Sequence, residues 1–180
     1  MEQLEVLKIV IEKLKSLSIE YMLTGSVAMN YYGQPRMTRD IDIVIVIDEP
    51  KIKKLIAAFK EEFYVNSETV FKEAMNRGMF NVIHNEYIVK VDFILQKNTE
   101  YDITAFERRK LIKVNDLHIC VISSEDLILN KLVWAREGNS EIQKRDVKNI
   151  LMMTEDLDLD YVRHWSIRLD VASILEECKP

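Results

Sequence analysis

The sequence predicts an α/β protein (α+β in the stricter sense), in which a mixed β-sheet carries flanking helices and a helical segment follows at the C-terminus. Short β-branched segments, of which 41–47 is the clearest, alternate with stretches whose apolar residues recur at helical spacing. From Ser123 onward the pattern is helical to the end. The 180 residues, 48% of them hydrophobic, are expected to form one compact unit, with 1–122 as the core and 123–180 as a helical segment packed on it.

Each expected element has a recognisable pattern or boundary signal. The helices expected before residue 123 are 2–17, 26–32 (capped by Ser26 and ended by Gly33), 50–63 (opened by Pro50), 67–77 (capped by Ser67) and 101–108. The expected strands are 20–24, 41–47, 80–84, 87–95, 111–114 and 118–122, with 80–84 and 87–95 forming a hairpin. Three further helices are expected over 123–138, 140–153 and 160–178.

Asp40 and Asp42 stand one position apart at the head of the strand 41–47. Because successive strand side chains point to opposite faces, these two carboxylates emerge side by side on one face. They repel each other unless a positive charge lies between them. Magnesium, a hard cation that takes oxygen ligands and keeps substrate phosphates in its shell, is the natural occupant.

Asp92 lies in the middle of the apolar strand 87–95 and shares a face with Lys90 and Ile94. A buried aspartate is costly unless it is paired or bound to a metal. We therefore predict that Asp92 is the third member of the group formed by Asp40 and Asp42.

The composition of the chain argues against several classes of function. The net charge of −5 argues against a protein held to nucleic acid by its overall charge. Cys120 and Cys178 are far apart and suggest neither a zinc site nor a disulfide framework. Since no apolar run approaches a membrane span and no export signal is evident, we expect a cytoplasmic protein without a membrane partner.

Several motifs occur in a fixed order along residues 21–175. They are Gly25-Ser26-Val27-Ala28, Gly33-Gln34-Pro35-Arg36-Met37-Thr38-Arg39-Asp40-Ile41-Asp42, Asp92, Asp126-Leu127-Ile128 with Lys131 and Leu132, Lys144-Arg145-Asp146-Val147, and Asp160-Tyr161 with Trp165. In this order they resemble the nucleotidyltransferase superfamily, which has the polymerase-β-type fold. The extended pattern resembles bacterial nucleotidyltransferases related to abortive-infection toxins and, more distantly, those that adenylylate aminoglycosides or lincosamides. Asn30, where many small members carry glycine, fits these branches better.

The resemblance implies magnesium-dependent transfer of a nucleoside monophosphate from an NTP such as ATP to an acceptor hydroxyl, with release of pyrophosphate. The acceptor stays open between an RNA end, a protein side chain and a small molecule. Asp40 and Asp42 are expected to hold two magnesium ions, and Asp92 to bind the second ion and accept the hydroxyl proton. The nucleotide-binding residues that the resemblance implies, through their contacts with the phosphates, are Gly25, Ser26, Arg36, Arg39 and Lys131.

Each of these roles has a structural alternative. Asp40 and Asp42 would otherwise form a solvated strand end or pair with Arg39, and Asp92 would pair with Lys90 or Arg36. Lys131 would be an ordinary surface lysine. For the whole chain, the alternative is a catalytically inactive nucleotide-binding or protein-interaction module of a toxin–antitoxin-type system, with an antitoxin-like partner or a homodimer. The presence of all three aspartates favours the enzyme.

Overall fold

The computed structural model describes residues 2–35, 37–38 and 40–179, and these form nine helices and one seven-stranded sheet. The strands are β1 (Glu20–Thr24), β2 (Asp40–Val46), β3 (Phe63–Val65), β4 (Met79–His84), β5 (Lys90–Leu95), β6 (Lys110–Val114) and β7 (Leu117–Val121). The helices are α1 (Glu2–Ser16), α2 (Gly25–Tyr32), α3 (Glu49–Phe59), α4 (Ser67–Met75), α5 (Glu100–Glu107), α6 (Ser124–Gly138), α7 (Glu141–Met153), α8 (Leu159–Arg168) and α9 (Ala172–Cys178). The predicted α/β class is confirmed.

The sheet is mixed, with the strand order β3-β4-β5-β2-β1-β7-β6. The pairs β2–β5 and β1–β7 are parallel, and the remaining neighbours are antiparallel. The predicted hairpin is present as β4 and β5. Strand β2 lies in the middle of the sheet, as its two apolar faces predict.

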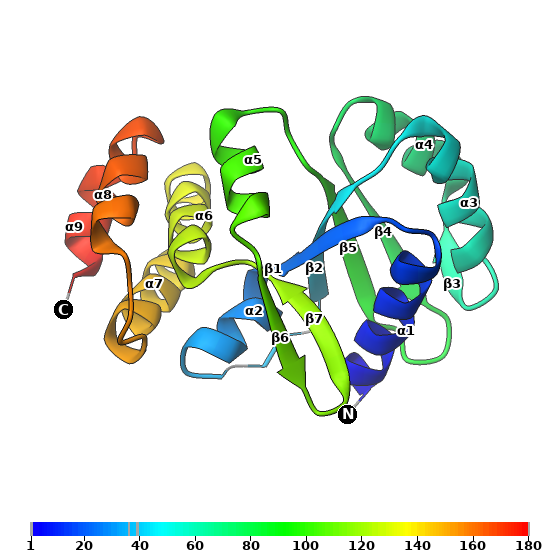
Figure 1. The fold of residues 1–180 in the computed structure, drawn as a ribbon, viewed down its shortest axis with the longest axis horizontal. Coiled ribbons are helices and arrows are strands. Elements are labelled where there is room, and N and C mark those ends of the chain that lie inside the picture. Colours follow the sequence, from blue (N-terminus) through cyan, green and yellow to red (C-terminus); the bar gives the residue numbers. More distant parts are fainter. Residues whose placement is uncertain (1, 36, 39, 180) are drawn as a thin grey trace.

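The helices form two groups on either side of the sheet, with α1, α3 and α4 in one and α2 and α5 to α9 in the other (Figure 1). Ile41, Ile43 and Ile45 on β2 are completely buried and belong to one hydrophobic core with apolar residues of α1 and α3. The alternate residues of β2, which include both aspartates, are only partly buried. The face of β2 that carries Ile41, Ile43 and Ile45 therefore packs into the core, and its opposite face carries the two aspartates.

Two helix boundaries near residues 60–67 differ from the prediction. Helix α3 ends at Phe59, and Phe63 instead starts β3, where it pairs with His84 and its ring lies 5.1 Å from that of Phe59. The cap of α4 is Asn66, whose side chain accepts a hydrogen bond from the Thr69 N–H at 3.0 Å. Pairing with a distant strand overrides the helical pattern here, and Asn66 serves as the cap in place of Ser67.

The single helix predicted over 160–178 is wrong, because the chain forms α8 and α9 with a turn between them. Asp170 adopts a left-handed conformation with φ of 56°. The N–H of Val171 bonds back to the Ser166 carbonyl at 2.8 Å, and Val171 is completely buried. The turn thus brings an apolar residue into the core at the end of α8. Across the described residues, no helix combines the length and apolar character needed to cross a membrane.

Candidate active site

Thr24, Asp42 and Asp92 lie in one row across three neighbouring strands. Thr24 of β1 is paired with Asp42 of β2, which is paired in turn with Asp92 of the parallel strand β5. Two residues earlier on both strands, Asp40 is paired with Lys90. The structure therefore brings the three predicted aspartates to one face, in two adjacent rows.

The turn between β1 and α2 fits closely over this row. Gly25 has φ of 65°, in the left-handed region, and a Cβ placed on it would meet the carboxylate of Asp42 and lie 2.8 Å from its Cβ. Only glycine allows this approach. The N-cap position of α2 is Thr24, whose side chain makes no capping bond, so the prediction that Ser26 caps the helix is wrong. Ser26 instead lies in the first turn, where its backbone N–H donates to Asp42.

Thr24, Asp42 and Asp92 form the inner row, and its two carboxylates are electrostatically unfavourable without a ligand. Burial, followed by the charge of Asp92, raises the pKa of Asp42 above its ordinary value, while the Ser26 N–H and Lys90 act in the opposite direction. Asp92 is 6% exposed, and its Oδ1 has no hydrogen-bond partner among the residues described. The hydroxyl oxygen of Thr24 is likewise buried and unpartnered within the described part of the chain. An unsatisfied buried polar group costs about 1–3 kcal/mol, so this row is suited to a ligand that supplies the missing interaction.

Asp40 and Lys90 form the outer row, and the ammonium of Lys90 contacts aspartates of both rows. Its Nζ lies 2.8 Å from Asp92 Oδ2 and 3.2 Å from Asp40 Oδ2. The hydrogen bond with Asp92 is the largest influence on the Lys90 pKa, which is raised above its ordinary value. The alternative expected for Asp92, a pair with Lys90, is therefore present in the structure. The sequence signal was the position of Lys90 two residues before Asp92 on the same strand face.

A cavity of about 770 Å³ opens on this face of the sheet. Gly25, Ser26, Asp42 and Asp92 line one side of it, and residues of α5, α6 and α8 line the other. Asp40 and Lys131 are not part of the wall. The cavity therefore joins four of the predicted site residues to the helical segment.

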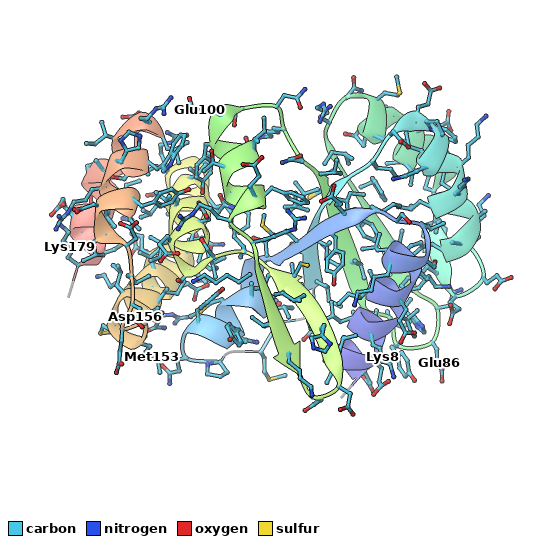
Figure 2. All side chains as sticks on the ribbon, viewed as in Figure 1. Lys8, Glu86, Glu100, Met153, Asp156 and Lys179 are labelled. Atoms are coloured by element: carbon cyan, nitrogen blue, oxygen red, sulfur yellow. The ribbon has the colours of Figure 1, made fainter. Side chains whose placement is uncertain are left out.

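The outer rim of the cavity is held by an ion pair between α5 and α8. Arg168 donates to both carboxylate oxygens of Glu100, at 3.1 and 2.6 Å. Figure 2 shows Glu100 at the end of α5 that lies beside α8. No local sequence pattern predicts this pair, because its two members are 68 residues apart.

Lys131 is placed differently from the other predicted nucleotide-binding residues. It is completely buried, and its Nζ donates to Asp146 Oδ2 at 2.7 Å and to Gln143 Oε1 at 3.0 Å. This is a buried ion pair between α6 and α7, and the structure does not place Lys131 on the cavity wall. A phosphate-binding role for Lys131 stays a prediction. Arg36 and Arg39 lie outside the described residues.

The predicted metal ligands Asp40, Asp42 and Asp92 do not form a complete metal-binding cluster in the structure. Within residues 2–35, 37–38 and 40–179, no group of three or more Asp, Glu, His or Cys side chains is arranged to hold a metal ion. Asp42 and Asp92 nevertheless lie side by side, and one buried oxygen of Asp92 has no described partner. Carboxylate oxygens are the ligands that magnesium prefers, so these two residues fit such an ion.

Comparison with known proteins identifies the fold. No protein-family model matches the chain, and no curated protein matches it in sequence. Among solved structures, an antigenic nucleotidyltransferase-like protein from Paracoccidioides brasiliensis is 19% identical with a TM-score of 0.58, over 97% of this chain and 92% of that chain.

Two antibiotic-modifying enzymes also have structures similar to that of this chain. The lincosamide antibiotic adenylyltransferase LnuA, solved with lincomycin, is 18% identical with a TM-score of 0.54, over 82% of this chain and 96% of that chain. ANT(2'')-Ia, solved with adenylyl-2''-tobramycin, is 10% identical with a TM-score of 0.62, over 94% of this chain and 98% of that chain. The chain therefore has the fold of the nucleotidyltransferases, as its motifs predicted.

Proposed function

We propose that this protein is a magnesium-dependent nucleotidyltransferase that moves a nucleoside monophosphate from an NTP to an acceptor hydroxyl and releases pyrophosphate. The observation that carries the proposal is the in-register pair Asp42–Asp92, with an unpartnered buried oxygen, next to the Gly25 turn on a cavity wall. The fold shared with nucleotidyltransferases supports the same assignment.

Asp42 and Asp92 would hold the metal through their carboxylate oxygens. Magnesium bound there would neutralise the triphosphate and stabilise the attacking and leaving oxygens. The first turn of α2 would offer backbone N–H groups to the phosphates, because these groups have no partner within the helix. Asp92 is also the proposed acceptor of the hydroxyl proton, because its carboxylate lies on the cavity wall.

We favour a small hydroxylated molecule as the acceptor, over an RNA end or a protein side chain. The cavity of about 770 Å³ lies within the range of roughly 300–1,000 Å³ that is typical of small-molecule sites. Tyr101, Trp134 and Trp165 contribute aromatic surface to its wall. The ligands of the two similar antibiotic-modifying enzymes, lincomycin and adenylyl-2''-tobramycin, also contain small-molecule acceptors.

Isothermal titration of ATP, GTP, CTP and UTP in the presence of magnesium tests the proposal. We expect at least one NTP to bind only with magnesium, and we expect Asp42→Asn to abolish that binding. Asp116→Asn is the matched control, because it removes an identical charge from an exposed turn between β6 and β7. Failure of the folded wild-type protein to bind any NTP would contradict the proposed function.

A further inference from the structure

The two rows of polar residues on the sheet differ in how their charges are balanced. In the inner row, Asp42 and Asp92 face each other across β2 and β5 with no cation paired in register between them. In the outer row, Asp40 is opposite Lys90, and the ammonium of Lys90 contacts it at 3.2 Å. Among the described residues, only the outer row has a lysine in register, and the ammonium of that lysine also contacts Asp92 of the inner row.

Lys90 is held in this position by the sheet. Its backbone pairs with Asp40 on β2 and with Ile83 on β4, so β5 cannot slide without breaking both ladders. Because residues two apart on a strand share a face, its side chain lies beside Asp92, and its Nζ is 2.8 Å from Asp92 Oδ2. The ammonium thus joins Asp40 to Asp92 across the two rows.

The two oxygens of Asp92 are consequently used in different ways. Oδ2 accepts from Lys90, whereas Oδ1 is buried and has no partner among the described residues. A cation between Asp42 and Asp92 would satisfy Oδ1 without disturbing Lys90. A second cation between Asp40 and Asp92 would have to displace the ammonium.

We propose that the site takes one divalent cation, between Asp42 and Asp92, and that the ammonium of Lys90 occupies the position a second cation would need. This inference rests on the proposed metal-dependent function and replaces the two ions that the motif resemblance implies. Lys90 acts as a positioning residue and internal counter-ion through Asp40 and Asp92. The site of the nucleotide-free protein then needs only one divalent cation to balance its three carboxylates.

Titration with Mn²⁺ alone tests the number of cation sites, with free Mn²⁺ followed by electron paramagnetic resonance. We expect the wild-type protein to bind one Mn²⁺ in this site and Asp42→Asn to bind none. Lys90→Met removes the internal cation and should raise the number to two, with affinity for the first ion increased by ~10-fold or more. Lys90→Arg keeps the charge and should bind one ion. Lys113→Met, an exposed lysine on the edge strand β6, controls for the change in net charge.

Two results would overturn the inference. One is that wild-type protein binds two Mn²⁺ ions with Lys90 in place, and the other is that Lys90→Met binds Mn²⁺ no differently from Lys113→Met. Magnesium-dependent NTP binding, measured on the same samples, separates these failures from a failure of the proposed function. If NTP binding persists, the transferase assignment stands and only the role of Lys90 is wrong.

Discussion

Asp92 in the sheet and Asp126 in helix α6 are both almost completely buried, yet their oxygens are satisfied to different degrees. Asp126 Oδ1 accepts from the Tyr161 hydroxyl at 2.7 Å, and its Oδ2 accepts from the Ser123 hydroxyl at 2.6 Å and Arg108 Nε at 3.3 Å. Asp92 Oδ2 contacts Lys90, and its Oδ1 has no described partner. A carboxylate with both oxygens bonded holds elements together, whereas one with an unpartnered oxygen on a cavity wall is available to a ligand.

The same contrast separates the two lysine–aspartate pairs. Lys131 and Asp146 are sealed between α6 and α7, with side chains 0% and 1% exposed. Lys90 and Asp40 are 37% and 47% exposed. The Lys131–Asp146 pair of the helical segment is therefore closed to solvent, whereas the Lys90–Asp40 pair on the sheet is partly exposed.

Lys131→Met should produce the largest loss of stability. The variant removes the buried ammonium that contacts Asp146 Oδ2 at 2.7 Å, and we expect the free energy of unfolding to fall by ~3–5 kcal/mol. Urea denaturation measures this. The double variant Lys131→Met/Asp146→Leu should recover most of the loss, and a loss below ~1 kcal/mol for the single variant would show that the pair is not structural.

Gly25→Ala should have the next largest effect, because a Cβ there meets Asp42 and the residue has φ of 65°. We expect a loss of about 2 kcal/mol in the free energy of unfolding, together with weaker NTP binding as Asp42 is displaced. Gly138→Ala is the matched control. A Cβ at Gly138 would meet only Ser140 Cβ at 4.0 Å, so this variant should be neutral or slightly stabilised.

Asp126 should give a smaller, pH-dependent effect. Burial raises its pKa above the ordinary value, so the folded state holds the proton more tightly than the unfolded chain. The contribution of Asp126 to stability should therefore fall as the pH rises from its ordinary pKa through the raised one, and then become constant. The difference in unfolding free energy between wild type and Asp126→Asn, measured against pH, should show this fall. A difference that rises over the same range would contradict the direction of the shift.

Asp92→Asn should change stability least of all. It removes a buried charge with one unpartnered oxygen but also weakens a contact with Lys90, so we expect the free energy of unfolding to change by less than ~1 kcal/mol. Magnesium-dependent NTP binding should nevertheless be lost. A large loss of stability would place Asp92 with Asp126 among the structural carboxylates.

Much of this arrangement could be predicted from local sequence patterns. The alternation of residues along β2 predicted that Asp40 and Asp42 share a sheet face, because the side-chain period of a strand is fixed at two. The cost of burying Asp92 predicted that it joins them, and the register of β2 with β5 places it there. Capping and turn signals located most helices within a few residues. The order of the motifs predicted the nucleotidyltransferase fold.

The remaining features depend on residues distant in sequence. Lys131 is buried because Asp146 approaches it from another helix, and nothing in its local pattern distinguishes it from a surface lysine. Trp165 and Arg168 of α8 line the cavity, although they are far in sequence from the strands that line its other side. The sequence left two partners open for Asp92, Lys90 and Arg36, and the structure shows the contact with Lys90.

The most direct test of the account is the stability of wild type and Asp42→Asn with and without magnesium and the NTP selected by titration. Without ligand, we expect Asp42→Asn to be at least as stable as wild type, because burial and the charge of Asp92 disfavour its carboxylate. With ligand at ~100 times its Kd, wild type should gain about 2.7 kcal/mol in the free energy of unfolding, and Asp42→Asn should gain none. Equal gains in both proteins, or no gain in wild type, would contradict the claim that this carboxylate pair is the ligand site.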